Sequence, residues 1–232
     1  MDTTLEPRDI RFDVADGRHE VSGLVVRPDD ARWLYVLGHG AGAGMRHPFM
    51  EAMARILAAR GVATFRYHFP YMERGRRRPD PRATLLATVR AAILTAAGTV
   101  FGLPLVAGGK SMGGRMTSLA LSESPMAEVA GLVFLGFPLH QPGKPSADRG
   151  AHLAELSVPM LFLQGTRDTL ADLTLLEPVC RSLGARATLH VVDGADHSFH
   201  VLKRSGRRDD EVLGELGDVM IAWARDRRGF GP

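Results

Sequence analysis

The chain has 232 residues, of which 45% are apolar and 24% charged, and its formal net charge is +3. These values are typical of a globular protein with a sizeable core. They exclude a disordered or fibrous chain and give no reason to expect a nucleic-acid partner. The single cysteine, Cys180, excludes an internal disulfide framework. We find neither an apolar run of membrane-spanning length nor a secretory signal pattern, and we expect a cytoplasmic protein without a membrane partner.

The first part of the chain has the pattern of β-strands. Residues 9–14 and 20–27 flank the pair Asp16-Gly17, which favours a hairpin turn. Residues 33–37 form an apolar run that ends before Gly38, as is typical of a strand buried on both faces.

The rest of the chain alternates between helical and extended patterns. Helices are predicted at about residues 48–60, 82–97, 111–123, 172–183 and 209–227, and strands at 62–67, 105–107, 132–135, 160–163 and 187–192. This βαβ alternation predicts a mostly parallel central sheet with helices on both faces. Because we find no internal repeat and no low-complexity linker, residues 1–232 are predicted to form a single α/β domain.

The segment FPYMERGRRRPDP, residues 69–81, has a different composition. Its prolines, glycine and four arginines predict a loop. The loop follows a predicted strand, and open α/β sheets bind ligands beyond the carboxyl ends of their strands, so we place it near the functional site. Residues 74–78 have two open interpretations: a solvated basic surface, or a surface that favours an anionic substrate.

The motif GGKSMGGR, residues 108–115, is compatible with two different sites. A phosphate-binding loop would need the pattern G-x-x-x-x-G-K-[ST]. Gly109-Lys110-Ser111 supplies its end, but Pro104 stands where the first glycine is required. The apolar run of residues 105–107 also predicts a strand where that loop needs an exposed turn, so we exclude a phosphate-binding loop.

A nucleophile elbow explains the same motif better. The elbow needs G-x-S-x-G between a strand and a helix, and Gly109, Ser111 and Gly113 fit this pattern. Glycines let the strand and helix approach each other while the serine hydroxyl projects above the sheet. The role of Lys110 stays open: the elbow tolerates many residues there, but a cation at that position could also pair with an acidic group in a neighbouring loop or tune the site.

A serine nucleophile needs a base, and the chain offers an acid and a histidine in the required order. Asp168 and His197 follow the predicted strands at 160–163 and 187–192, so both should lie at the sheet edge where Ser111 projects. Asp172 fits better as a helix cap, and His200 lies deeper in the following segment. We therefore predict a catalytic triad of Ser111, Asp168 and His197.

The oxyanion hole of such a site consists of two backbone N–H groups. One would come from Met112, which follows the nucleophile, and the other from Ala41 in the glycine-rich segment 38–48. His39 is expected to be a structural hydrogen-bonding residue. A dinucleotide-binding fingerprint fails in every register of this segment, because its last glycine would fall on Ala43, Met45 or His47.

The interval from residue 135 to residue 160 is too short for a cap domain, with one short helix expected at residues 148–153. The site should therefore be open, and long lipid substrates are not expected. Its substrate-binding rim is predicted from Tyr71, Met72, Phe137, Leu139 and His140, with ordinary packing under a loop as the alternative for the apolar members. No metal-ligand spacing is found, so neither a metal nor a cofactor is expected.

Several strings of the sequence are similar to the α/β-hydrolase superfamily, and more narrowly to its dienelactone-hydrolase-like branch. They are HGAG, GGKSMGGR, FLGFPLHQPGKP and ADHSF, and the similarity runs from about Arg11 to Arg227. The resemblance implies the α/β-hydrolase fold with Ser111 as nucleophile, Asp168 as acid and His197 as base. Dienelactone hydrolases have a cysteine nucleophile, so Ser111 departs from their pattern and leaves the substrate open.

These observations support two hypotheses. The first is a serine hydrolase that cleaves a small carboxylic ester or thioester, with a small-molecule acyl compound as its substrate. The same residues would also serve a peptidase or an acyltransferase. The alternative is an interaction or scaffold module that keeps the fold but has little or no activity. The oligomeric state is not predicted.

Overall fold

The computed structural model describes residues 6–14 and 17–227. The strands are β1 (Arg8–Asp13), β2 (Glu20–Val26), β3 (Trp33–Gly38), β4 (Val62–Tyr67), β5 (Leu105–Lys110), β6 (Val129–Leu135), β7 (Met160–Gly165) and β8 (Ala187–Val192). The α-helices are α1 (Pro48–Ala58), α2 (Pro70–Glu73), α3 (Arg82–Thr99), α4 (Met112–Glu123), α5 (Leu173–Ser182) and α6 (Asp209–Arg225). Three short 3-10 helices are η1 (Asp148–Glu155), η2 (Gly184–Arg186) and η3 (Lys203–Ser205).

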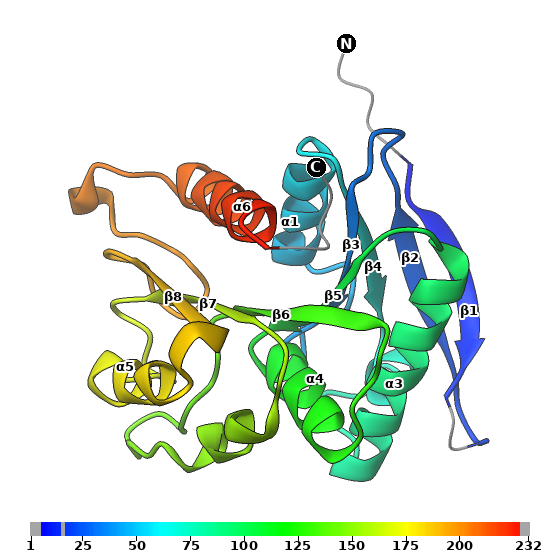
Figure 1. Ribbon diagram of the computed structural model, residues 1–232, viewed down its shortest axis with the longest axis horizontal. Coiled ribbons are helices and arrows are strands. Elements are labelled where there is room, and N and C mark those ends of the chain that lie inside the picture. The colour runs from blue at the N-terminus through cyan, green and yellow to red at the C-terminus, as the bar shows by residue number, and fades with distance from the viewer. Residues whose placement is uncertain (1–5, 15–16, 228–232) are drawn as a thin grey trace.

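The strands form one sheet in the order β1-β2-β4-β3-β5-β6-β7-β8. Strand β2 is antiparallel to both β1 and β4, and all pairs from β4 to β8 are parallel. The carboxyl ends of β3, β5, β7 and β8 therefore meet at one edge of the sheet (Figure 1).

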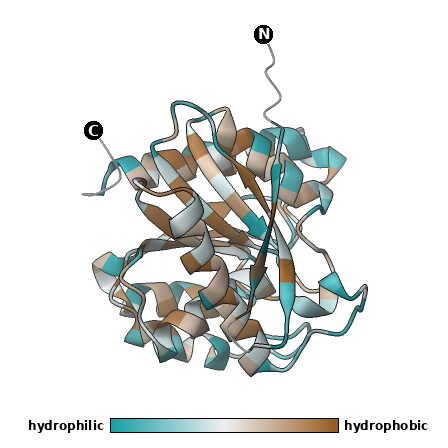
Figure 2. Cartoon of the chain, turned by 90° about the vertical axis from the view of Figure 1, so that its right-hand side faces the viewer, coloured by the Kyte–Doolittle hydropathy of each residue, from teal (hydrophilic) through white to brown (hydrophobic). Residues whose placement is uncertain are grey.

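Helices cover both faces of the sheet. Helices α1 and α6 lie on one face, and α3, α4 and α5 lie on the other (Figure 1). Each face has its own apolar core, one around Leu37, Met53 and Trp223 and the other around Val36, Phe134 and Phe162. Strands β3, β4, β5 and β7 are buried along their whole length. This explains their largely apolar sequences, which appear as brown segments in the strands of Figure 2.

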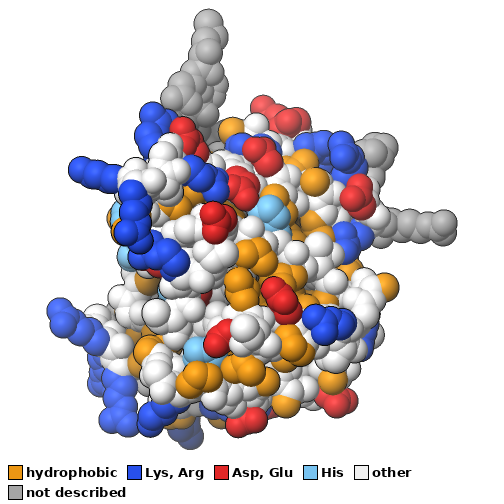
Figure 3. All heavy atoms as spheres, turned by 90° about the vertical axis from the view of Figure 1, so that its left-hand side faces the viewer, with side chains coloured by type: hydrophobic (Ala, Val, Ile, Leu, Met, Phe, Trp, Pro, Cys, Tyr) orange, Lys and Arg blue, Asp and Glu red, His pale blue; other side chains and the backbone are white. Residues whose placement is uncertain are grey.

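The outer strand β8 is less enclosed than the central strands. Most of its residues are only partly buried, and Val191 is exposed. Seen from this side of the molecule, hydrophobic side chains gather near the middle of the face and most lysine and arginine side chains lie towards its margins (Figure 3).

The predicted mostly parallel sheet with helices on both faces is confirmed. Predicted element ends differ from the observed ones by up to three residues, as in β5, which continues to Lys110. The predicted hairpin turn includes Asp16, which lies outside the described residues. Strands β1 and β2 pair on either side of that turn, with Asp13 opposite Glu20.

The segment 69–81 needs a correction, because it is not wholly a loop. Residues Pro70–Glu73 form the helical turn α2, which has Pro70 in its first turn, where the fixed φ of proline suits a helix start. The Asp80 carboxylate accepts a hydrogen bond from the Tyr71 N–H at 2.6 Å and forms an ion pair with Arg74. These contacts fold the segment back on itself.

Candidate active site

The residues predicted to form a triad lie at the shared edge of the parallel strands. Ser111 follows the last residue of β5 directly, and Asp168 lies three residues after β7 ends. His197 lies in the loop after β8, residues 193–202, which we call the histidine loop. The register of the sheet places the ends of β3 and β5 side by side, with Gly38 opposite Gly109.

The backbone at Ser111 is strained in the way a nucleophile elbow requires. Ser111 has φ of 50° and ψ of −115° and is the residue before α4. Such a conformation is unfavourable for a residue with a side chain and persists only when its surroundings enforce it. The hydroxyl does not cap the helix, so it remains available for another partner.

Close packing of backbone around the elbow explains its glycines. A Cβ atom added to Gly109 would lie 2.2 Å from the Gly38 carbonyl oxygen, and one added to Gly113 would lie 2.3 Å from the same oxygen. Both distances are far below any van der Waals contact. Strand β3, the elbow and the first turn of α4 can therefore meet only if both positions are glycine.

The three side chains form one continuous chain of hydrogen bonds. His197 Nε2 lies 2.8 Å from Ser111 Oγ, and His197 Nδ1 lies 2.7 Å from Asp168 Oδ2. The rival histidine, His200, points elsewhere and pairs with Asp209 at 2.8 Å. Asp172 caps α5 by accepting a hydrogen bond from the Thr174 N–H. The structure thus brings together the three residues that the sequence singled out.

Asp168 is held by more than the histidine. Its side chain is 1% exposed, and its Oδ1 accepts a hydrogen bond from the Leu170 N–H at 2.7 Å. The Gln164 side-chain amide donates to Oδ2 of the same carboxylate. Gln164 was not predicted as a site residue, although a polar residue near the end of the otherwise apolar strand MLFLQG is a signal for such a contact.

The histidine loop is held by hydrogen bonds to the side chain of Asp196, the residue before His197. Asp196 Oδ1 accepts hydrogen bonds from the N–H groups of Ser198 and His200, at 2.8 and 3.0 Å. Phe199 adopts a positive φ of 63°. Because these contacts close the loop on itself, the position of the imidazole depends on how the loop docks against its neighbours.

Two backbone N–H groups near Ser111 are free to bind an oxyanion. Within the described part of the chain, neither Met112 nor Ala41 donates its backbone N–H to another residue. The β3–α1 loop that carries Ala41 passes close to the elbow, since a Cβ at Gly40 would lie 3.7 Å from Ser111 Cβ. The arrangement can accept a carbonyl oxygen between the loop and the start of α4.

Comparison with protein families agrees with this geometry. The family model described as an α/β hydrolase domain matches residues 31–225. The chain belongs to the α/β hydrolase family.

Solved structures with the same fold cover nearly all of this hydrolase. One is an α/β serine hydrolase homologue from Coxiella burnetii, with 17% identity, a TM-score of 0.73 and coverage of 93% of this chain and 96% of that one. An α/β serine hydrolase without lid from Xanthomonas campestris has 19% identity, a TM-score of 0.72 and coverage of 94% and 95%. Dienelactone hydrolase from Anabaena variabilis has 21% identity, a TM-score of 0.72 and coverage of 95% and 98%. At these identities the likeness shows the fold.

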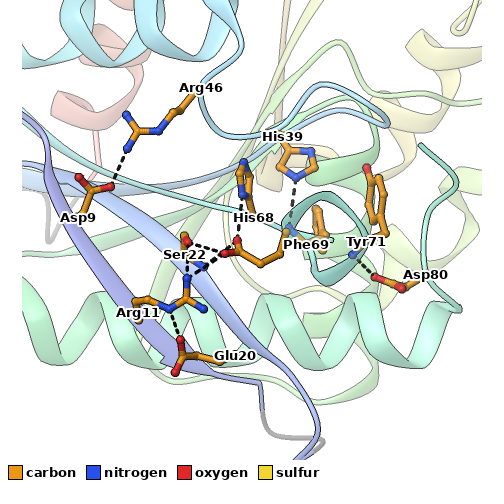
Figure 4. Close-up of polar contacts among 11 residues, drawn as sticks. Asp9, Arg11, Glu20, Ser22, His39, Arg46, His68, Phe69, Tyr71 and Asp80 are labelled. Atoms are coloured by element: carbon orange, nitrogen blue, oxygen red, sulfur yellow. Dashed lines mark hydrogen bonds and ion pairs between the residues drawn. The ribbon is translucent and has the colours of Figure 1, made fainter. Parts of the chain in front are cut away.

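Residues at the start of α2 hold the β3–α1 loop of the hydrolase in place (Figure 4). The Tyr71 hydroxyl accepts a hydrogen bond from the Gly42 N–H at 3.1 Å. His39 Nδ1 donates to the Gly40 carbonyl at 2.7 Å, and its Nε2 accepts from the Phe69 N–H at 3.3 Å. His39 is therefore the structural hydrogen-bonding residue that the sequence predicted, and it joins the loop to the start of α2.

A second polar group anchors α2 to the sheet (Figure 4). The Glu73 carboxylate accepts hydrogen bonds from the Ser22 hydroxyl at 2.7 Å and from Arg11 at 3.0 Å. His68 Nδ1 lies 3.1 Å from the same carboxylate. Because β2, α2 and the end of β4 all meet at Glu73, this group fixes the support of the β3–α1 loop.

Burial of His39 makes the stability of the hydrolase depend on pH. Desolvation lowers the pKa of His39 from 6.5 to about 4, so the folded protein binds this proton more weakly than the unfolded chain does. The stabilisation is therefore complete above pH 6.5 and is lost as the pH falls towards 4, by about 3 kcal/mol in total. The His39→Gln variant lacks this group, so its free energy of unfolding should fall less over the same range. Urea unfolding at intervals between pH 7 and 4 measures the difference, and equal slopes for both proteins would contradict the expectation.

The predicted substrate-binding rim is largely buried, which corrects the expectation of an open rim. Tyr71, Phe137 and Leu139 are at most 1% exposed, and His140 is 5% exposed. His140 Nε2 accepts a hydrogen bond from the Asp172 N–H at 2.8 Å. Packing is thus the better description of these four residues. Met72 is only partly buried.

Among the residues that the structure describes, no group of three or more His, Cys, Asp or Glu side chains is arranged to hold a metal ion. Within residues 6–14 and 17–227, no helix has the length and apolar character needed to cross a membrane.

Proposed function

We propose that the protein is a serine hydrolase that cleaves a small carboxylic ester or thioester through an acyl-enzyme intermediate. The observation that carries this proposal is the unbroken hydrogen-bonded chain from Ser111 through His197 to the buried Asp168. A hydrolase fold supplies the frame, and the strained elbow presents the nucleophile.

Acylation begins when His197 Nε2 takes the proton of the Ser111 hydroxyl. The serine oxygen attacks the substrate carbonyl carbon, and the carbonyl electron pair moves to its oxygen, which becomes an oxyanion. The N–H groups of Met112 and Ala41 bind that oxyanion. Asp168 stabilises the imidazolium and holds the tautomer in which Nδ1 carries a proton. The tetrahedral intermediate collapses, and His197 gives its Nε2 proton to the departing alcohol or thiol.

Deacylation repeats the sequence with water. His197 takes a proton from a water molecule, whose oxygen attacks the acyl carbon of the ester formed with Ser111. Collapse of the second tetrahedral intermediate breaks the bond to the serine oxygen, which recovers its proton from His197. The carboxylic acid leaves, and the site returns to its starting state.

The preference for a small substrate rests on the absence of a large insertion over the site. Between β6 and β7, the described chain contains only a loop and the eight-residue helix η1. The similar structure from Xanthomonas campestris is likewise described as lacking a lid. Without a lid, little apolar surface is available to shield a long acyl chain from water, so short acyl groups are preferred.

Labelling with a fluorophosphonate probe tests the proposal directly. The probe phosphonylates a serine only when that serine is activated as a nucleophile. We expect stoichiometric labelling of the folded protein at Ser111, located by mass spectrometry of the digested product, and none in the Ser111→Ala variant. Folded wild-type protein that stays unlabelled would overturn the proposal and support an interaction module instead.

A further inference from the structure

Lys110, the residue before Ser111, is a buried cation that the mechanism does not use. It is the last residue of β5, and only 9% of the residue's surface is exposed to solvent. Most lysines are exposed, because removing an ammonium group from water is costly unless it is paired. The position of Lys110 beside the nucleophile therefore calls for a specific explanation.

The ammonium group of Lys110 contacts the histidine loop. Its Nζ donates a hydrogen bond to the backbone carbonyl of His197. It also lies over the rings of Phe49 and Phe199, at 5.8 and 5.5 Å from their centroids. The two rings are themselves stacked, with centroids 6.0 Å apart. Lys110 thus joins the elbow, the start of α1 and the histidine loop at one point.

The surroundings of the Lys110 ammonium group are largely apolar. Among the described residues, no carboxylate lies within ion-pair distance of Lys110. Asp168 and Asp196 act on it only through longer-range electrostatic attraction. A Cβ atom added to Gly136 would lie 3.1 Å from Lys110 Nζ and 3.4 Å from His197 Nδ1, so the ammonium group and the imidazole both pack against Gly136.

We propose that Lys110 is a positioning residue: its charged hydrogen bond to the His197 carbonyl holds the histidine loop in the docking that places the imidazole against Ser111. The inference rests on the proposed function of the triad. It identifies a role for the residue between Gly109 and Ser111 that the elbow geometry alone does not require. A neutral, apolar side chain of similar length would fill the same space but would leave the carbonyl without its donor.

Because the proposed hydrogen bond depends on the charge of Lys110, the activity should depend on pH in the range where the lysine loses its proton. Desolvation lowers the pKa of Lys110 from 10.5 to about 8, against the opposing attraction of Asp168 and Asp196. Hydrogen bonds from a charged donor are stronger than those from a neutral one. Above pH 8 the lysine loses its charge, so the wild-type kcat should decline there. The titratable groups that act on Lys110 are Asp168 and Asp196, and His197 accepts its hydrogen bond through the backbone carbonyl. All three residues remain in the variants below.

The experiment compares Lys110→Met with wild type. A displacement of about 1 Å in a catalytic group can lower the rate about a hundredfold. We expect kcat on p-nitrophenyl acetate, per site titrated with the fluorophosphonate, to fall about a hundredfold, and we expect no decline above pH 8 once spontaneous hydrolysis is subtracted. Lys203→Met, at an exposed lysine in η3, is the matched control and should keep both kcat and the alkaline decline.

A second variant and a spectroscopic measurement test the same role of Lys110 independently. Lys110→Gln retains an N–H donor without charge and should show an intermediate kcat, again without the alkaline decline. In proton NMR, the far-downfield signal of the proton shared by His197 and Asp168 should be sharp in wild type and broadened in Lys110→Met. An unchanged kcat per titrated site, an unchanged pH profile or an unchanged signal would overturn the positioning role. Failure of wild type to be labelled at Ser111 would instead overturn the proposed function on which it rests.

Discussion

Replacing Ser111 with alanine is expected to lower kcat on p-nitrophenyl acetate by roughly five to six orders of magnitude, the loss found when the nucleophile of a serine triad is removed. The variant loses the nucleophilic hydroxyl that His197 would activate, since the histidine Nε2 lies 2.8 Å from Ser111 Oγ. The remaining oxyanion donors can polarise a carbonyl but cannot form an acyl-enzyme.

The control for this experiment lies on the same helix. Ser122→Ala removes a hydroxyl whose hydrogen bond goes to the Leu119 carbonyl within α4, and kcat should stay within about twofold of wild type because surface changes of this kind are small. Steady-state rates and thermal unfolding of all three proteins complete the comparison. Wild-type turnover by purified Ser111→Ala would disprove the nucleophile assignment.

Replacing Gly113 with alanine is expected to destabilise the fold by about 3 kcal/mol or more, at the upper end of the effects of overpacking. Alanine normally favours a helix by about 1 kcal/mol over glycine, so propensity alone predicts the opposite sign. The added Cβ would lie 2.3 Å from the Gly38 carbonyl oxygen and 2.4 Å from its carbon. Both atoms belong to the buried strand β3, which is hydrogen-bonded on both sides and cannot move aside.

Gly98→Ala is the matched control, because Gly98 also lies in a helix but has no atom within 4 Å of the added Cβ. This variant should be stabilised by about 0.5 to 1 kcal/mol. Urea unfolding followed by circular dichroism gives both free energies. Equal effects at the two positions would show that the strand–helix contact does not limit residue 113.

Local patterns in the sequence were enough to predict most of the fold. Strands β3, β4 and β7 are largely apolar because both faces of the sheet are covered, so their sequences identify them without any tertiary information. Helix caps could also be predicted, because their contacts are local: Asp172 caps α5 by a contact with a residue two positions away. The α2 turn escaped prediction because its stabilising partners lie outside the helix: Asp80 accepts from the Tyr71 N–H, and Ser22 on β2 donates to Glu73.

That Ser111, Asp168 and His197 meet could be predicted, because in a parallel sheet the order of the strands along the chain sets where their carboxyl ends lie. Ser111, Asp168 and His197 each follow the carboxyl end of a strand, and those ends share one edge of the sheet. The buried state of the expected rim could not be predicted, since the exposure of Phe137 or Leu139 depends on what packs over it.

The sequence by itself determined the parallel sheet, the elbow and the meeting of Ser111, Asp168 and His197, because each depends on spacing along the chain. Only the tertiary structure decided the roles of Gln164 and Lys110. Both are polar residues within buried strands. Gln164 contacts Asp168 across the turn that follows β7, and Lys110 contacts His197 in a distant part of the chain. The elbow motif by itself does not explain why a cation stands at Lys110. Its partner is a backbone carbonyl 87 residues away, which no pattern of side chains encodes.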